Sequence, residues 1–154
     1  MEDTMKHILL LATVVMIMGG CSNSNNPVAS TSETVNSGTL QYTLSIPKEI
    51  YTTQDTLNVT LIAHNIGSVT DTMGIGSAVL CEWSLNNASG KVMFSGKATG
   101  NSFTLAYIPP GESKLVDAWI HALTDSNGNP LTPDSYSFNV NYSGNLFSLH
   151  LIVQ

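Results

Sequence analysis

Apolar and polar side chains alternate one by one through most of the chain after residue 38, and this period of two constrains the fold more than any other feature. The segment 39–46 places four polar residues on one face and four apolar residues on the other, and 56–65 and 146–153 repeat the pattern. The residues predicted to face inward are Leu40, Tyr42, Leu44 and Ile46, then Leu57, Val59, Leu61 and Ala63, and finally Phe147, Leu149, Leu151 and Val153. Successive side chains of a β-strand point to opposite faces. Each such segment therefore predicts a strand with one face in the core and one face in solvent.

Eight strands are predicted in this way, separated by clusters of Gly, Pro, Asn, Asp and Ser that favour turns. No stretch of ten residues shows the spacing of an amphipathic helix. Short strands at this density predict two packed sheets, so we expect residues 39–154 to form an all-β, immunoglobulin-like antiparallel β-sandwich. The predicted strands are 39–46, 56–65, 78–85, 91–95, 102–108, 114–122, 135–142 and 146–153.

Four residues are expected to have particular roles in this core, and two of them, Trp83 and Trp119, are expected to anchor it. Trp83 and Trp119 are the largest apolar side chains on predicted inward faces. Tyr136 follows a turn that contains Pro133 and enters a late strand, which is the arrangement of a tyrosine corner, where the hydroxyl bonds back to nearby backbone. Cys81 shares a strand face with Trp83, and it is predicted to be a small buried hydrophobe.

The amino-terminal residues have the features of an export signal. An apolar run of eleven residues, with Thr13 as its one polar member, covers 8–18 and follows Lys6 and His7. The run is too short to span a bilayer, which takes about 20 residues, but it suits the core of a signal peptide. Because Glu2 and Asp3 do not suit a positively charged amino-terminal region, we expect translation to start at Met5.

The apolar run ends in Gly19-Gly20-Cys21, which resembles a bacterial lipobox. Residues 1–20 are therefore predicted to be a cleaved signal peptide, and Cys21 is predicted to carry the lipid. Two or three acyl chains anchor a protein stably, so the chain is expected to be exported and attached to a membrane through lipid. Both the cell membrane and the outer membrane remain open, with the domain facing the periplasm or the exterior.

Residues 21–38 are rich in Ser, Thr and Asn and show no periodicity. We therefore predict a flexible linker without secondary structure. Once Cys21 is acylated, Cys81 is the only remaining cysteine, so the mature chain has no intramolecular disulfide.

The charge of the chain excludes one class of partner. Five Lys, no Arg and eleven acidic residues give a formal net charge of −6, and the lysines form no cluster along the sequence. Nucleic acids are recognised through clustered basic side chains, above all Arg. Nucleic-acid binding is therefore not expected.

Catalytic and metal-binding patterns are also missing from the sequence. His64, His121 and His150 fall on three separate predicted strands, and we expect them to be solvated. The segment 125–129 alternates oxygen-bearing side chains as a calcium loop does, but the required sixth and twelfth positions are Pro130 and Tyr136, so a plain hairpin loop is predicted. We expect no metal, no cofactor and no enzymatic activity.

Residues from about 40 to 142 resemble the BsuPI-type intracellular proteinase inhibitor domain, a small immunoglobulin-like sandwich. The resemblance depends on an ordered series of motifs rather than on one of them. The series is His64-Asn65-Ile66-Gly67, Asn87-Ala88-Ser89-Gly90-Lys91-Val92, Leu105-Ala106-Tyr107-Ile108-Pro109-Pro110-Gly111-Glu112-Ser113, Trp119, Asp125-Ser126-Asn127-Gly128-Asn129-Pro130-Leu131 and Pro133-Asp134-Ser135-Tyr136.

The resemblance implies a non-catalytic binding domain that inhibits or binds proteases by presenting a rigid loop. Two loops are candidates, 96–103 and 107–113, and the sequence favours neither. The candidate residues are Thr99, Asn101 and Phe103 in the first loop, and Tyr107, Pro109 and Pro110 in the second. The alternative is a structural or assembly module that binds another envelope protein or a cell-wall polymer. The sequence does not define the oligomeric state.

Overall fold

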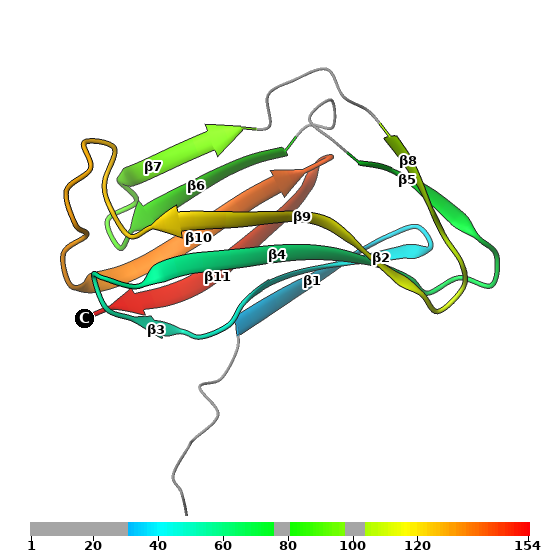
Figure 1. The fold of residues 1–154 in the computed structure, drawn as a ribbon, viewed down its shortest axis with the longest axis horizontal. Helices are drawn as coiled ribbons and strands as arrows, with labels where there is room; N and C mark the ends of the chain where they lie inside the picture. The colour runs from blue at the N-terminus through cyan, green and yellow to red at the C-terminus, as the bar shows by residue number, and fades with distance from the viewer. Residues whose placement is uncertain (1–30, 76–80, 98–103) are drawn as a thin grey trace, which may run out of the picture.

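A computed structural model describes residues 31–75, 81–97 and 104–154, and all the regular elements in these ranges are β-strands (Figure 1). The predicted all-β fold is therefore confirmed. In chain order the strands are β1 (Thr31–Ser37), β2 (Leu40–Ile46), β3 (Ile50–Tyr51), β4 (Thr56–Asn65), β5 (Asp71–Ile75), β6 (Cys81–Asn87), β7 (Val92–Lys97), β8 (Thr104–Ile108), β9 (Ser113–Ala122), β10 (Asp134–Tyr142) and β11 (Asn145–Val153).

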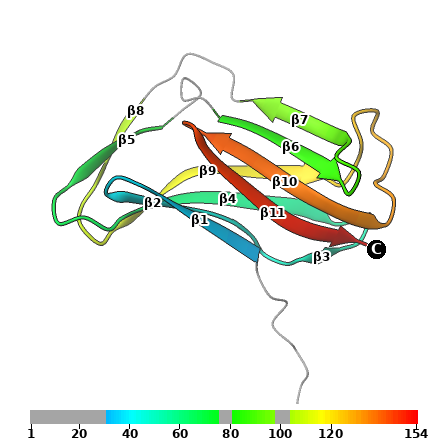
Figure 2. The same cartoon turned by 180° about the vertical axis from the view of Figure 1, so that it is seen from behind.

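Two sheets lie face to face and form a sandwich (Figures 1 and 2). One has the strand order β1-β2-β4-β9, and the other has the order β3-β11-β10-β6-β7. All of these neighbours are antiparallel except β3, which runs parallel to β11. Strands β5 and β8 form a separate antiparallel ribbon. This ribbon extends from the end of the sandwich opposite to the carboxyl terminus (Figure 1).

The core lies between the two sheets and is built from alternate residues of facing strands. On β2, the four residues predicted to face inward are all buried, and the same holds for the predicted inward residues of β4 and β11. Burial of each such side chain contributes about 1.5–3 kcal/mol. The side chains with 1% exposure or less include Leu44, Leu57, Leu61, Leu85, Phe138, Leu149 and Leu151.

Each of the eight predicted strands overlaps an observed one. Strands β3 and β5 were not predicted. Strand β3 has only two residues, and β5 is five residues long and contains Gly74, so neither has a recognisable alternation. Both segments become strands through pairing with segments distant in sequence: β3 pairs with β11, and β5 pairs with β8.

The prediction of a linker without secondary structure over 21–38 is wrong for residues 31–37. These residues form β1, which pairs with β2 along its whole length, from Thr31 opposite Ile46 to Ser37 opposite Leu40. Val35 is the one apolar residue of β1, and it packs against the core. One apolar residue gives no periodic signal, and the strand forms because β2 offers it an unpaired edge. The sandwich therefore includes residues 31–37.

Residues 1–30 lie outside the described residues, and with them the predicted signal peptide, Cys21 and the first part of the linker. In the part of the chain that the structure describes, there is no helix that could cross a membrane.

The two predicted aromatic features of the core are present. The Tyr136 hydroxyl donates to the backbone carbonyl of Thr132 at 2.7 Å, so the tyrosine corner is confirmed. The rings of Trp83 and Trp119 lie 5.7 Å apart between the sheets. Trp119 is buried, whereas Trp83 is half-buried and lies against Gly96, where a Cβ would come within 2.6 Å of its ring. Gly96 thus makes room for the indole at the edge of the core.

Replacing Tyr136 by Phe tests the tyrosine corner. The change removes one partly buried hydrogen bond to backbone while keeping the ring, so we expect the free energy of unfolding to fall by about 1 kcal/mol. Urea denaturation followed by circular dichroism measures this difference. Tyr107→Phe is the matched control, because Tyr107 is 63% exposed. Equal stability of the two variants would contradict the assignment.

Candidate functional site

One of the two candidate loops can be described in full. The loop 107–113 joins the end of β8 to the start of β9, at the ribbon end of the sandwich (Figure 1). It contains Tyr107, Pro109 and Pro110. In the loop 96–103, the candidate residues Thr99, Asn101 and Phe103 lie outside the described residues.

The side chain of Asn65, the last residue of β4, fixes the loop 107–113. Asn65 is 0% exposed, and within the described ranges no other polar residue is fully buried. Its Nδ2 donates to the carbonyl of Ile108 at 2.8 Å and to that of Val69 at 2.7 Å. Its Oδ1 accepts from the backbone N–H of Gly67 at 2.8 Å. Through these hydrogen bonds the Asn65 amide connects the loop that contains Val69 to the loop 107–113.

The backbone of Asn65 adds two more hydrogen bonds to the same loop. Its carbonyl accepts from Gly111 N–H at 2.9 Å, and its N–H donates to the Glu112 carbonyl at 3.0 Å. Glu112 N–H also donates to the Pro109 carbonyl at 3.1 Å, which closes a tight turn, and Gly111 adopts the positive φ of 74° that this turn needs. The loop is therefore a rigid turn and not an extended segment.

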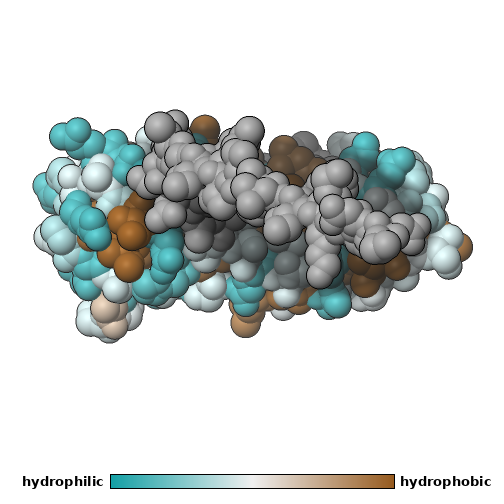
Figure 3. All heavy atoms as spheres, turned by 90° about the horizontal axis from the view of Figure 1, so that it is seen from below, coloured by the Kyte–Doolittle hydropathy of each residue, from teal (hydrophilic) through white to brown (hydrophobic). Residues whose placement is uncertain are grey.

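Four large apolar side chains are exposed around this turn, and we call them the distal patch: Ile66, Val69, Leu105 and Tyr107. Leu105 and Tyr107 lie on the outer face of the ribbon, and Val69 lies on the second loop that Asn65 holds. Val69 is 66% exposed. In the view from below, hydrophobic side chains appear at the ribbon end and also at the opposite end of the molecule (Figure 3). Exposed apolar groups gathered on a fixed backbone are typical of a protein-binding surface.

The histidines do not gather into a site. His64 and His121 lie at opposite ends of the β4–β9 pair, and His150 lies in the other sheet. His64 contacts the Ser113 hydroxyl at 3.0 Å, and His150 lies 3.5 Å from a Glu49 carboxylate oxygen. Over the described ranges, no three His, Cys, Asp or Glu side chains are placed to hold a metal ion.

The prediction that all three histidines are solvated is wrong for His121. Its ring lies between the sheets, with ring centroids 5.0 Å from Phe94 and 6.1 Å from both Trp83 and Phe138. Burial lowers the pKa of His121, and its Nε2 atom is buried without a hydrogen-bond partner. This residue therefore extends the aromatic core, as a neutral ring.

Cys81 and Asp125 have the structural roles that the sequence predicts. Cys81 is buried in the core, and burial raises the pKa of its thiol to about 12, with Asp117 and Glu82 adding to the effect. The thiol is thus protonated at neutral pH and is a poor nucleophile. The Asp125 carboxylate accepts the N–H groups of Asn127 and Asn129, both at 2.9 Å, which lowers the pKa of Asp125. These hydrogen bonds of Asp125 close a hairpin loop over residues 125–129.

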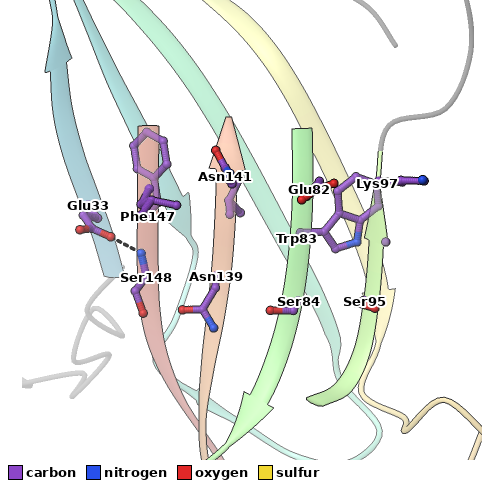
Figure 4. A pocket seen from close by; sticks show the side chains of 13 residues that line it. Glu33, Glu82, Trp83, Ser84, Ser95, Lys97, Asn139, Asn141, Phe147 and Ser148 are labelled. Atoms are coloured by element: carbon purple, nitrogen blue, oxygen red, sulfur yellow. Dashed lines mark hydrogen bonds between the residues drawn. The ribbon is translucent and has the colours of Figure 1, made fainter. Parts of the chain in front are cut away.

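A groove on the outer face of the five-stranded sheet was not predicted from the sequence. It encloses about 830 Å³, and Figure 4 shows polar side chains of four strands lying across it. We call it the sheet groove. Two rows of directly opposed residues form its floor. The first row is Ser148, Asn139, Ser84 and Ser95, and the second row is Leu146, Asn141, Glu82 and Lys97.

Glu33 of β1 forms one end of the sheet groove. Its carboxylate accepts the backbone N–H of Ser148, which lies on the edge of β11 that β3 does not cover (Figure 4). The sequence contains the alternation that turns these polar residues outward. It does not contain the lateral order of the strands, and that order places the two rows side by side.

Comparisons with known proteins do not assign the chain to a family. No protein-family model and no curated protein matches the sequence. Among solved structures, a β-glucosidase from Erythrobacter marinus is similar to 81% of this chain, at 16% identity and a TM-score of 0.43, over 16% of its own length. A β-glucosidase from Listeria innocua is similar to 81% of the chain at 13% identity and a TM-score of 0.40, again over 16% of its length.

A third structure is the alkylpurine DNA glycosylase of Pseudomonas fluorescens bound to DNA, similar to 71% of this chain at 7% identity and a TM-score of 0.44. The match covers 28% of that chain. In all three cases this chain therefore corresponds to less than a third of a longer protein, and the likeness supports no assignment of activity.

Replacing Asn65 by Ala tests the support of the distal patch. The variant leaves the carbonyl groups of Val69 and Ile108 and the N–H of Gly67 without their partner, so we expect a loss of about 2–4 kcal/mol in the free energy of unfolding. Chemical denaturation measures this loss. Asn58→Ala is the control, since the Asn58 side chain is exposed and its one bond, to the Thr56 carbonyl, is 3.3 Å long. A loss no larger than that of the control would contradict the role given to Asn65.

Proposed function

We propose that this chain is an exported lipoprotein whose β-sandwich is a non-catalytic binding domain, and that its distal patch contacts a protein partner. The observation that supports this most is the fixed backbone beneath Tyr107 and Val69. Because Asn65 holds both loops in place, little conformational entropy is lost when a partner docks on them. Tyr is also among the residues that contribute most to binding at protein interfaces.

The direction of β1 supports attachment at the opposite end. Ser37 lies opposite Leu40, and Leu40 lies opposite Asn65, so the end of β1 is close to the ribbon. Thr31 lies at the other end of β1, away from the ribbon (Figure 1). A lipid on Cys21, joined to the domain through Thr31, would leave the distal patch free to meet a partner.

A protease is the partner class that the resemblance to BsuPI-type inhibitors implies. The geometry of the loop 107–113 bears on how it would bind. Its centre is a tight turn closed by Glu112 and Pro109, so it offers side chains and a turn rather than an extended, substrate-like strand. If the domain instead binds another envelope protein during assembly, the same distal patch would contact that protein. We therefore keep both partner classes, a protease and another envelope protein.

The lipid anchor is tested by metabolic labelling with palmitate in a bacterial host. We expect the wild-type chain to incorporate label and to stay in the membrane fraction, because Cys21 is the acceptor. Cys21→Ala should lose the label completely. Cys81→Ala is the control and should keep it, since Cys81 is buried in the folded domain. Label retained on Cys21→Ala would refute the anchor.

The protein-binding proposal is tested by titrating the full chain, in detergent, against a panel of serine proteases. Inhibition by the wild type that falls at least about tenfold in Tyr107→Ala, but not in Ile120→Ala, would identify a protease partner bound at the distal patch. Ile120 is a suitable control because it is 73% exposed on β9, outside the patch.

An assembly role predicts a different result in the same system. No protease is inhibited, and a photo-crosslinking residue at position 107 forms one defined protein adduct in cells, while the same residue at position 120 forms none. Absence of both inhibition and a position-specific adduct would refute the proposed function.

A further inference from the structure

The sheet groove is a second surface, separate from the distal patch and from the tight turn at the ribbon. We propose that it binds a short, uncharged oligosaccharide. The proposal goes beyond the protein-binding function above, and either one can hold without the other.

The groove has the shape of a short, shallow strip. Its two rows cross the four strands β11, β10, β6 and β7. Neighbouring strands are about 4.8 Å apart, so each row is roughly 14 Å long. The rows are two residues apart along each strand, or about 7 Å. Glu33 closes the strip at β11, and Lys97 lies at its other end on β7. A chain of linked rings fits a strip of these dimensions.

The side chains of the groove match the hydrogen-bonding chemistry of sugars. A sugar hydroxyl both donates and accepts, and the Ser hydroxyls and Asn amides of the two rows do the same. Asn139 and Asn141 occupy the centre of the floor, each flanked by Ser84 or Glu82 on the neighbouring strand. Because they project from paired strands, their positions are set before a ligand arrives.

A sugar ring also has an apolar face of C–H groups, and one exposed side chain of the groove can contact it. Leu146 is 70% exposed in the second row, where it can cover the C–H face of a ring. Among the described residues that line the groove, no aromatic ring serves this purpose: Phe147 is buried, and the Trp83 ring points into the core, where it lies 5.7 Å from that of Trp119. Binding therefore depends on hydrogen bonds, and we expect it to be weak for a single site.

Charge and shape argue against the other ligand classes. Glu33 and Glu82 outnumber Lys97, so an anionic polymer such as a nucleic acid or an acidic glycan would be repelled. A peptide or a folded protein needs a pocket for an apolar or aromatic anchor, and Leu146 is the one apolar side chain in the two rows of the floor. An uncharged, hydroxyl-rich chain remains as the ligand that fits.

The test uses the full chain in a detergent without a sugar head group. Maltotetraose, cellotetraose and tri-N-acetylchitotriose are titrated at millimolar concentration and followed by saturation-transfer NMR. We expect saturable binding of at least one of them, and at least about tenfold weaker binding by Asn139→Ala, the equivalent of one lost hydrogen bond with a buried partner. Ser137→Ala is the matched control, since Ser137 lies on the same face of β10 outside the groove.

A second variant covers the case in which Asn139→Ala does not fold. Asn141→Asp keeps the side-chain oxygen that accepts the Gly144 N–H at 3.2 Å, but it removes the amide donor and adds a charge. It should also weaken binding at least about tenfold. Tyr107→Ala should leave sugar binding unchanged, which separates this site from the distal patch.

Three results would each overturn the proposal. The first is the absence of saturable binding to all three sugars. The second is equal affinity of the Asn139 and Asn141 variants and the Ser137 control. The third is tighter binding of an acidic trisaccharide, trigalacturonate, than of the neutral sugars.

Discussion

The two sheets share one dry interior, and every other part of the structure depends on keeping alternate side chains in it. Strands β2, β4, β10 and β11 each place an unbroken series of apolar residues between the sheets. A shift of one residue in the pairing of any two strands would expose these apolar side chains to solvent. The register is therefore strongly specified. The same constraint fixes the outer faces. Asn139 and Ser84 are directly opposed outside the sandwich because Phe138, Val140 and Leu85 are held inside it.

Asn65 is the point at which this interior is joined to a surface. A buried amide without partners costs several kcal/mol, so its hydrogen bonds to Val69, Ile108 and Gly67 leave the two loops little freedom. The exposed side chains of Val69 and Tyr107 are thus positioned by a residue that no solvent reaches. A polar group in the core is here the means of holding apolar groups at the surface.

The two proposed binding surfaces lie at different distances from the start of the described chain. Glu33, at the end of the sheet groove, is two residues after Thr31, whereas the distal patch lies at the far end of the sandwich. In the proposed orientation, only the Glu33 end of the groove lies near the start of the described chain, and the distal patch faces a partner further from the membrane. The two proposed surfaces are separate, so binding of the oligosaccharide does not block the protein partner.

The sequence alone predicted the sandwich. A strand with one buried face needs an apolar residue at every second position, and this period of two is visible in the sequence. It also predicted the inward residues of β2, β4 and β11, the corner at Tyr136 and the burial of Cys81, each of which depends mainly on local pattern. Tertiary structure decided the rest. Strand β1 has one core residue, Val35, and forms because β2 presents an open edge. His121 is enclosed by three aromatic rings from other strands, which its own neighbours in sequence do not reveal. The sheet groove exists only because β11, β10, β6 and β7 lie side by side, and lateral strand order is a long-range property that no local pattern encodes.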